Sequence, residues 1–381
     1  MTKHCLIISA SIGGGHVSAA LALEQAFAQH PETQDWRVEH LDLINFTYVG
    51  FRRLYRDAYF DLVNRVPDFV DWFGRQLEQN HTGRQQRLLS RLSRIASRRL
   101  ARYIKNHQPD IIIHTHFLAP ALLNKARYAH IPQYCVVTDY GAHRIWYHSH
   151  LQGYFVACPE VAVHLRSYDI PSEHIHTTGI PIKQSFKSVL GQDDARQRLN
   201  VSGQSLLFLA SGIKATVVRD LLQQLRQLSL DLDIFIICGR SPELQNVVRR
   251  SLQGYRGRSR FHQIGYSQDL PLYMAAADLL IGKPGGLTSS EALATALPMA
   301  IVSPYPLQEE ANANYLLENG VAMRIEPLSV FGFKLERFLN EAPRQQHMRQ
   351  AALQLAKPQA ADHIVDYLSQ ASHEGRDQSR S

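Results

Sequence analysis

The sequence predicts an α/β protein whose strands form doubly wound parallel sheets. Strand-like runs alternate with helix-like segments along the 381 residues. Most of these runs are apolar on both sides, as strands are when helices cover both faces of a parallel sheet. The pattern stops over residues 178–203, where glycine, proline and charged residues replace apolar ones, and then starts again. These observations favour two domains.

The strand-like runs are short and recur through both halves of the chain. In the first half they are residues 5–9, 36–43, 110–116, 133–139, 153–158 and 174–179, and in the second half residues 205–211, 233–239, 260–265, 278–282, 298–304 and 321–326. We place the domain boundary at residue 188. This gives an N-terminal domain of residues 1–188, a C-terminal domain of residues 189–370 and a polar tail, residues 371–381, that we expect to be disordered.

The composition is that of a soluble globular protein, with 45% hydrophobic and 20% charged residues. No apolar run approaches the eighteen residues or so that a membrane span needs, and the N-terminus lacks a secretory signal pattern. The four cysteines show no CxxC spacing, so we expect buried free thiols. The net charge of +7 indicates an anionic partner: a membrane surface, nucleic acid or phosphates.

Residues 9–20, "SASIGGGHVSAA", join a strand to a helix through three glycines and His16. The turn is neither a dinucleotide fingerprint, because Ser18 replaces the third glycine, nor a P-loop, because no G-K-[S/T] follows. Glycines let a ligand approach the backbone, and a helix N-terminus favours negative charge. A substrate site and a tight turn with an incidental histidine are equally open from this stretch alone.

A second glycine turn lies in "DLLIGKPGGLTSSEALATALPMAIVSP". Gly285 and Gly286 precede a helix that begins near Thr288 and Ser289, and amides and hydroxyls at such a place bind phosphate. Glu291 follows one turn into the helix, where a carboxylate can accept hydrogen bonds from both ribose hydroxyls. The alternative is a carboxylate that the helix dipole merely favours. The combination is more specific than either part.

Polar residues follow two further strands of the predicted sheets. Asp139, His143 and Trp146 in "TDYGAHRIWYHS" could line one crevice together with His16, although a lone histidine is usually structural. Gln308 and Glu309 in "YPLQEEANANYL" could bind sugar hydroxyls, with a capping turn as the alternative.

The sequence "DLDIF" contains a D-x-D, Asp231 and Asp233, of the kind that holds a metal–nucleotide complex in some glycosyltransferases. Here it comes before its strand, at the wrong edge of the sheet, and we interpret it as a loop. We therefore expect no metal site at this sequence.

A basic helix is predicted in the segment between Glu78 and Asp110, which contains no acidic residue. Its arginines recur every three or four positions and so share one helix face: Arg84, Arg87, Arg91, Arg94, Arg98 and Arg102. The ordinary explanation is a solvated face. Charge of a single sign repels itself along the helix, however, and an anionic membrane surface would relieve that repulsion.

Four stretches together resemble monogalactosyldiacylglycerol synthases and bacterial diacylglycerol glucosyltransferases: "SASIGGGHVSAALALEQAF", "TDYGAHRIW", "TTGIPI" and "GKPGGLTSSEALATALPMAIVSPYPLQEEANANYL". A more distant likeness is to the enzyme that adds N-acetylglucosamine to lipid I. The resemblance covers about residues 4–325 in order. It implies a GT-B fold, two Rossmann-like domains facing each other across a cleft. It also implies a UDP-hexose donor held by the C-terminal domain, a lipid acceptor held by the N-terminal domain, inversion at the anomeric carbon, and no cofactor or metal in the chemistry.

The resemblance also implies roles for single residues of the N-terminal domain. His16 would be the catalytic base, with Asp139 as the second catalytic candidate. Gly14 and Gly15 would lie near the acceptor, and His143 and Trp146 match the acceptor-side motif.

For the UDP-sugar, the resemblance implies contacts along the second half of the chain. Gly265 and Tyr266 would meet uracil, Glu291 the ribose, and Gln308 and Glu309 the sugar. The diphosphate would be held by Gly285, Gly286, Thr288 and Ser289, and Lys183 would reach a phosphate. One departure is the turn "LASGIKATVV", where Gly212 stands alone and Lys214 could supply charge in place of backbone amides.

These features favour a hexosyltransferase that makes glycolipid while bound to the inner, cytoplasmic face of a bacterial membrane. The expected partners are a UDP-hexose, a lipid acceptor, most simply diacylglycerol, and an anionic membrane surface. A GT-B enzyme with a non-lipid acceptor or a UDP-sugar epimerase is an alternative, and a non-catalytic UDP-sugar-binding protein is another. No nucleic-acid-binding motif is present, so we expect no nucleic acid partner.

Overall fold

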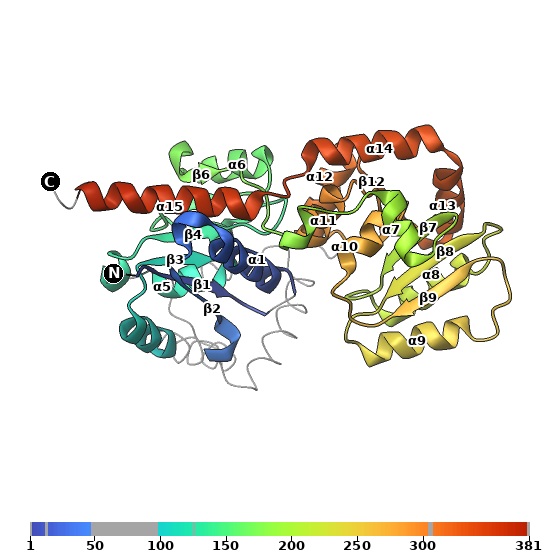
Figure 1. The fold of residues 1–381 in the computed structure, drawn as a ribbon, viewed down its shortest axis with the longest axis horizontal. Helices are drawn as coiled ribbons and strands as arrows, with labels where there is room; N and C mark the ends of the chain where they lie inside the picture. The colour runs from blue at the N-terminus through green and yellow to red at the C-terminus, as the bar shows by residue number, and fades with distance from the viewer. Residues whose placement is uncertain (1, 12–13, 47–97, 125, 304–307, 379–381) are drawn as a thin grey trace, which may run out of the picture. The chain divides into compact units, whose positions relative to one another are not determined.

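The structure is a computed structural model, and it describes residues 2–11, 14–46, 98–124, 126–303 and 308–378. The chain divides into two compact units (Figure 1). The N-terminal unit comprises Met1–Gln184 and Gln359–Ser381, and the C-terminal unit comprises Ser185–Pro358. Each unit contains one parallel sheet with helices on it, as the sequence predicts for an α/β protein.

The sheet of the N-terminal unit has six parallel strands in the order β2-β1-β3-β4-β5-β6. Its strands are β1 (His4–Ser9), β2 (Arg37–Asp42), β3 (Ile111–His114), β4 (Gln133–Val136), β5 (Gly153–Phe155) and β6 (Ile175–His176). Its helices are α1 (Gly15–Gln29), α5 (Leu118–Leu123), α6 (Pro159–Arg166), α15 (Ala360–Gln378) and a helix over residues 98–107.

Strand β1 explains why both faces of this sheet are covered. Cys5 and Ile7 pack in one cluster with side chains of α1 and α15. Leu6 and Ile8, which alternate with them, pack in a second cluster with the 98–107 helix and α5. All four side chains are fully buried, which is what an uninterrupted apolar strand predicts for a parallel sheet.

The C-terminal unit repeats the architecture with the strand order β12-β11-β10-β7-β8-β9, again all parallel. Its strands are β7 (Gln204–Leu209), β8 (Leu232–Ile237), β9 (Arg260–Ile264), β10 (Leu279–Gly282), β11 (Met299–Ile301) and β12 (Ala322–Arg324). Its helices are α7 (Gln192–Leu199), α8 (Ala215–Leu225), α9 (Pro242–Leu252), α10 (Leu270–Ala276), α11 (Gly286–Ala294), α12 (Gln308–Glu318), α13 (Phe331–Asn340) and α14 (Ala342–Leu355). Each of the two sheets thus contains the strands that the alternating pattern predicts.

The end of the chain departs from the prediction. The units meet at Gln184 and Ser185 rather than at residue 188, and residues from 359 onward belong to the N-terminal unit instead of the C-terminal one. Helix α15 continues to Gln378, where we expected disorder from residue 371. The physical reason is an apolar stripe, Ile364, Val365 and Leu368, that is fully buried against α1.

Helix α15 lies beside α1 (Figure 1), and two polar contacts hold it in the N-terminal unit. The Nε2 atom of His30, the residue that follows α1, lies 2.8 Å from Asp366 Oδ1. Lys3 Nζ donates to the carbonyl oxygen of Ser372 at 2.8 Å. The C-terminal helix is therefore a structural part of the N-terminal unit.

The four cysteines are free and buried, as predicted. Within the ranges that the structure describes, no helix is long and apolar enough to cross a membrane.

Candidate functional site

The C-terminal ends of three adjacent strands bring the main polar residues of the N-terminal unit together. Strand β1 leads through the glycine turn to His16, the second residue of α1. Strand β3, its neighbour in the sheet, leads to Thr115 and His116, and β4 leads to Thr138. Ligands of open α/β sheets bind at this edge.

Hydrogen bonds fix the tautomer of His16. Its Nδ1 atom lies 2.8 Å from the carbonyl oxygen of Thr115 and 2.8 Å from Thr138 Oγ1. A carbonyl oxygen can only accept, so Nδ1 carries the hydrogen and donates it. In the neutral ring Nε2 is then an unprotonated acceptor, which is the form a base requires. Thr115 Oγ1 donates to the carbonyl oxygen of His16 at 2.9 Å and ties the same turn of α1 to β3.

Burial keeps the His16 ring neutral. Desolvation lowers its pKa to about 4, and the hydrogen bond to the Thr115 carbonyl opposes that shift. The His16 ring is therefore uncharged at neutral pH, and its Nε2 atom is able to take up a proton.

Aromatic rings line the same strand edge. The His116 ring meets His16 edge to face with a centroid distance of 4.3 Å, and the Trp146 ring lies 6.2 Å from His16. Leu118 N donates to His116 Nδ1 at 3.2 Å, so in its neutral ring the hydrogen is on Nε2. Trp146 is fully buried, and neither its Nε1 nor His143 Nε2 has a hydrogen-bond partner among the described residues. Such atoms are unusual and could bind a ligand oxygen or water.

The other site residues predicted in the N-terminal unit have mixed outcomes. Gly14 is the N-cap of α1 at a φ of −82°, and a Cβ atom there would meet nothing within 4 Å. Within the described residues, neither backbone strain nor packing requires a glycine here, which leaves room for a ligand. Gly15 begins α1, whose N-terminus has no side-chain cap. Asp139 is buried, and Thr138, the residue before it, bonds to His16.

In the C-terminal unit the second glycine turn joins β10 to the uncapped N-terminus of α11, as the sequence predicts. Gly285 is the N-cap and Gly286 is the first helical residue. Thr288 is half-buried, while Ser289 is fully buried and its Oγ lacks a hydrogen-bond partner within the described part of the chain. Glu291 is also buried, one turn into the helix. The free amides and the buried hydroxyl suit a phosphate oxygen.

Lysine side chains gather at this edge of the second sheet. Lys283 directly follows β10, and its Nζ lies 3.6 Å from Glu309 Oε2 in the first turn of α12. The exposed fractions of the two side chains are 11% and 18%. Lys214, the N-cap of α8, is close enough to lower the pKa of Lys283 electrostatically. Gly212 before it has a φ of +80°, a left-handed conformation that explains the single glycine in that turn.

The residues predicted to meet uracil lie at the end of β9. Gly265 follows the strand directly, and the Tyr266 ring is 54% exposed. The Arg240 guanidinium lies 4.3 Å from the centroid of that ring. An exposed aromatic ring at a strand end can stack on a planar base.

Two of the predicted donor contacts stay predictions. Gln308 begins α12, and its side chain lies outside the described residues. Lys183 is half-buried and belongs to the N-terminal unit, so its contact with a phosphate stays a prediction.

The basic face is described only in part. Arg84, Arg87, Arg91 and Arg94 lie outside the described residues. Arg98 and Arg102 are exposed on the 98–107 helix, and Leu100 and Ile104 are buried beneath it. The two arginines of the predicted basic face that the structure describes are therefore exposed.

The D-x-D sequence has a structural role. Asp233 lies within β8 rather than in a loop, and it is buried. Its carboxylate accepts two hydrogen bonds from Arg260, at 2.8 and 2.5 Å, and lies 2.8 Å from His262 Nε2. Both oxygens are thus occupied. Among the described residues no group of three histidine, cysteine or acidic side chains could hold a metal ion.

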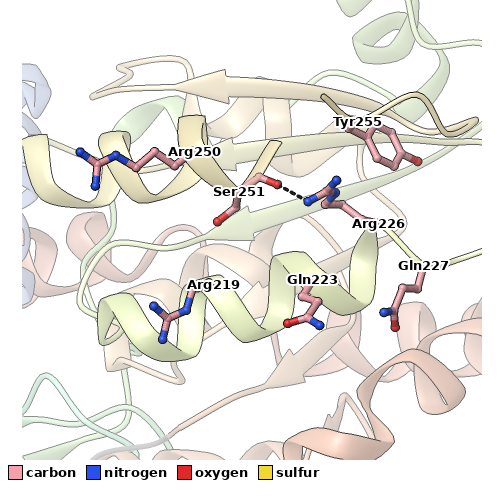
Figure 2. A pocket seen from close by; sticks show the side chains of 7 residues that line it. All are labelled: Arg219, Gln223, Arg226, Gln227, Arg250, Ser251 and Tyr255. Atoms are coloured by element: carbon pink, nitrogen blue, oxygen red, sulfur yellow. Dashed lines mark hydrogen bonds between the residues drawn. The ribbon is translucent and has the colours of Figure 1, made fainter. Parts of the chain in front are cut away.

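A groove of about 590 Å³ in the C-terminal unit is a different feature from this strand edge (Figure 2). Its lining residues come from α8, α9 and the turns that follow them: Arg219, Gln223, Arg226, Gln227, Arg250, Ser251 and Tyr255. Arg226 donates to the Ser251 carbonyl oxygen at 2.7 Å, in the last turn of α9. Arginines at helix C-termini stabilise the carbonyl ends of those helices, so we do not place the donor there.

Sequence reasoning missed Thr115, His116, Thr138 and Lys283. The first three follow predicted strands, but their contact with His16 depends on β1, β3 and β4 being neighbours in the sheet. The signal available was their position directly after apolar strands. Lys283 stands between a strand and a glycine turn, which was a sufficient reason to consider it.

Comparison with known families gives two matches that together span most of the chain. The sequence profile described as monogalactosyldiacylglycerol (MGDG) synthase matches residues 16–182. The profile described as glycosyltransferase family 28 C-terminal domain matches residues 212–366.

Similar individual proteins agree with those profiles. A "processive diacylglycerol beta-glucosyltransferase" of Bacillus cereus (strain AH187) is 29% identical over 389 residues, covering 97% of this chain and 94% of the relative. The crystal structure of MurG from Acinetobacter baumannii has a TM-score of 0.65 at 20% identity, covering 97% of this chain and 99% of that one. A UDP-GlcNAc 2-epimerase of Neisseria meningitidis bound to UDP-GlcNAc has a TM-score of 0.59 at 13% identity, covering 97% and 99%. These structures establish the predicted GT-B fold.

Proposed function

Because the chain belongs to the family of monogalactosyldiacylglycerol synthases and diacylglycerol glucosyltransferases, we propose that it transfers a hexose from a UDP-sugar to a lipid hydroxyl, with inversion at the anomeric carbon. The proposed acceptor is diacylglycerol, the lipid in the name of the Bacillus cereus relative. The observation that carries the proposal is the His16 ring, which is neutral and has its Nε2 lone pair available at the strand edge.

His16 performs the proton transfer in this mechanism. The lipid hydroxyl loses its proton to Nε2 as its oxygen bonds to the anomeric carbon, and the bond from that carbon to the diphosphate breaks. The Thr115 carbonyl holds the Nδ1–H and stabilises the positive charge that develops on the ring. A ring that is neutral before the reaction is ready to accept the proton at neutral pH.

The C-terminal unit binds the donor in this mechanism. The free amides at the start of α11 and the positive charge of Lys283 face the negative charge that grows on the departing diphosphate. Glu291 accepts hydrogen bonds from the ribose, and Tyr266 stacks on uracil. Arg260 and His262 already engage Asp233, and on that donor set we propose that no metal ion takes part.

A lipid substrate requires the enzyme to work at a membrane surface. The exposed arginines of the 98–107 helix, with those that precede them in the sequence, suit anionic lipids. We therefore propose a peripheral enzyme at the inner face of a bacterial cell membrane.

Product analysis tests this function. The full chain is incubated with EDTA, UDP-glucose or UDP-galactose, and vesicles that contain diacylglycerol, and lipids are examined by mass spectrometry. We expect hexosyl-diacylglycerol to form from at least one donor in the presence of EDTA. Release of an epimerised sugar nucleotide without any glycolipid would instead favour the reaction named for the Neisseria meningitidis structure.

A further inference from the structure

His16 and His116 are neighbours at the strand edge of the N-terminal unit, and their rings are in opposite tautomers. The two rings meet edge to face with their centroids 4.3 Å apart. Nδ1 of His16 donates to the Thr115 carbonyl oxygen, which leaves Nε2 as a hydrogen-bond acceptor. Nδ1 of His116 accepts from Leu118 N, which leaves Nε2 as a donor. The pair therefore offers one acceptor nitrogen and one donor nitrogen at the same edge.

The donor of His116 has no use within the described part of the chain. Only 2% of this residue is exposed, and its Nε2 has no hydrogen-bond partner among the described residues. A buried N–H group without a partner costs free energy, so such a group is suited to a ligand or a water molecule. Burial and the nearby His16 lower the pKa of His116 well below its usual value, so the ring stays neutral and keeps this tautomer at neutral pH.

Aromatic side chains pack against the two histidines. Phe117 lies against His116 with a centroid distance of 4.2 Å, and the Trp146 ring lies 5.5 Å from Phe117. Phe117 and Trp146 are both buried. Apolar walls of this kind strengthen a hydrogen bond, because little water competes for the donor, and they suit a substrate that is mostly hydrocarbon.

We infer that His116 determines which acceptors the enzyme takes, because its Nε2–H binds an oxygen on the carbon next to the one that carries the reacting hydroxyl. In diacylglycerol this oxygen belongs to the ester on the middle carbon of the glycerol. The inference rests on the proposed transfer to a lipid hydroxyl, and it adds the part of the acceptor that the site recognises.

The chemistry of the transfer explains why the donor serves the neighbouring oxygen. The attacking hydroxyl oxygen needs its lone pairs for the anomeric carbon, and a hydrogen bond from His116 would withdraw electron density from them. A hydrogen bond spans about 3 Å, so two rings with centroids 4.3 Å apart can contact two oxygens of one glycerol. An acceptor held at both oxygens has its free hydroxyl directed to His16.

The test compares two acceptors that differ only at the recognised oxygen. One is 1,2-diacylglycerol, and the other is an analogue in which an alkyl chain of equal length replaces the ester on the middle carbon. Each acceptor is presented in vesicles to the full chain, with UDP-glucose or UDP-galactose at saturation, and glycolipid is measured by mass spectrometry to give kcat/KM. We expect the unaltered chain to prefer diacylglycerol by about 10-fold, the usual effect of one neutral hydrogen bond.

Three variants assign this preference to His116. His116→Asn keeps an acceptor for Leu118 N but has no donor at the position of Nε2, so kcat/KM should fall about 10-fold for diacylglycerol and change little for the analogue. His116→Gln has an N–H donor near the position of Nε2 and should keep the preference. His130→Asn is the matched control, because His130 is an exposed histidine of the same unit, and it should leave both values unchanged.

The outcomes separate this role of His116 from the proposed transfer. Equal kcat/KM for the two acceptors in the unaltered chain, or a preference that His116→Asn retains, would overturn the role of His116 and leave the proposed transfer intact. An equal fall for both acceptors in His116→Asn would assign the residue a structural role and would also overturn it. If neither acceptor were glycosylated from either donor, both proposals would fail together. The comparison within the unaltered chain needs no variant, so it remains decisive even if a circular dichroism melt shows that His116→Asn does not fold.

Discussion

The two sheets are built alike, yet their C-terminal edges carry different chemistry. In the N-terminal unit the strand ends hold His16 and His116, rings that burial keeps neutral. In the C-terminal unit they hold Lys283, Lys214 and Glu309, side chains with opposite charges. Of the nineteen histidines in the chain, only His262 and His347 belong to the C-terminal unit. In the proposed mechanism, one fold thus serves proton transfer in one unit and anion binding in the other.

Replacing the base should have the largest effect. His16→Ala should lower kcat by about 10²–10⁴-fold, the usual contribution of a general base. The substitution removes the ring whose hydrogen bonds to Thr115 and Thr138 leave Nε2 as the proton acceptor. Donor affinity should change little, because the groups proposed to bind the donor belong to the other unit. Steady-state rates at saturating donor and lipid measure this, and near-normal kcat would leave Asp139 or His143 as the next candidate for the base.

Lowering the pH should destabilise the N-terminal unit more than the C-terminal unit. His114 is fully buried with a pKa lowered to about 3, and His148 has a pKa lowered to about 4. For both, burial is the main cause, and the nearby His150 adds repulsion. In the unfolded chain these rings take up protons near pH 6.5, so stability is complete above that pH and is lost as the pH falls toward the folded pKa. At pH 5 each such ring costs about 2 kcal/mol.

Hydrogen exchange at pH 7 and pH 5, corrected for intrinsic rates, measures this difference. Protection should fall in β3 and β5 of the N-terminal unit and persist in β7 and β8 of the C-terminal unit. His114→Phe, whose ring cannot be protonated, should recover part of the lost protection at pH 5. Equal acid sensitivity in both sheets would remove this distinction between the units.

Removing the Glu291 carboxylate, which is proposed to bind the ribose, should affect only the binding of the donor. Glu291→Ala should weaken UDP binding by about 2–3 kcal/mol, the value of a charge-assisted pair of hydrogen bonds. Glu291 is buried, so Glu291→Gln serves as the variant that keeps its volume. Calorimetry with EDTA present gives the affinity, and the proposed site would be wrong if UDP bound the Glu291→Ala chain as tightly as the original.

The basic face should have the smallest effect per residue. Arg98→Gln and Arg102→Gln together should weaken binding to anionic vesicles by about 1 kcal/mol per arginine, and added salt should shrink the difference. Arg219→Gln with Arg250→Gln is the matched control, because both arginines are exposed in the groove of the C-terminal unit. Vesicle flotation measures binding, and an equal loss from the control pair would assign the effect to net charge alone.

Much of the fold could be predicted from local pattern. Apolar runs flanked by glycine turns predicted the strands of both sheets, since an uninterrupted apolar strand is stable only where helices cover both faces. The return of α15 to the N-terminal unit could not be predicted, because a stripe such as Ile364, Val365 and Leu368 would suit either sheet. Its place is decided by the side chains of α1 opposite it.

The candidate site was predictable only where one turn carries it. The glycines before His16 and after Lys283 predict turns in the sequence, and the structure places both turns at strand ends. The partners of His16 are distant in sequence, because Thr115 and Thr138 reach it only through the order of β1, β3 and β4. The tautomer of His16 likewise follows from a backbone carbonyl, which no sequence pattern identifies.

A single-turnover experiment tests the central claim, that the N-terminal unit transfers the proton and the C-terminal unit binds the donor. The enzyme is loaded with saturating UDP-sugar and mixed rapidly with lipid vesicles, and the rate of glycolipid formation is compared among the original chain, His16→Gln and Glu291→Gln. The account predicts that His16→Gln binds the donor normally and transfers it at least about 100-fold more slowly, because glutamine cannot accept the proton. Glu291→Gln should need more donor and then transfer at close to the original rate. A normal transfer rate in His16→Gln would contradict the account. So would a loss of donor affinity in His16→Gln together with normal donor affinity in Glu291→Gln.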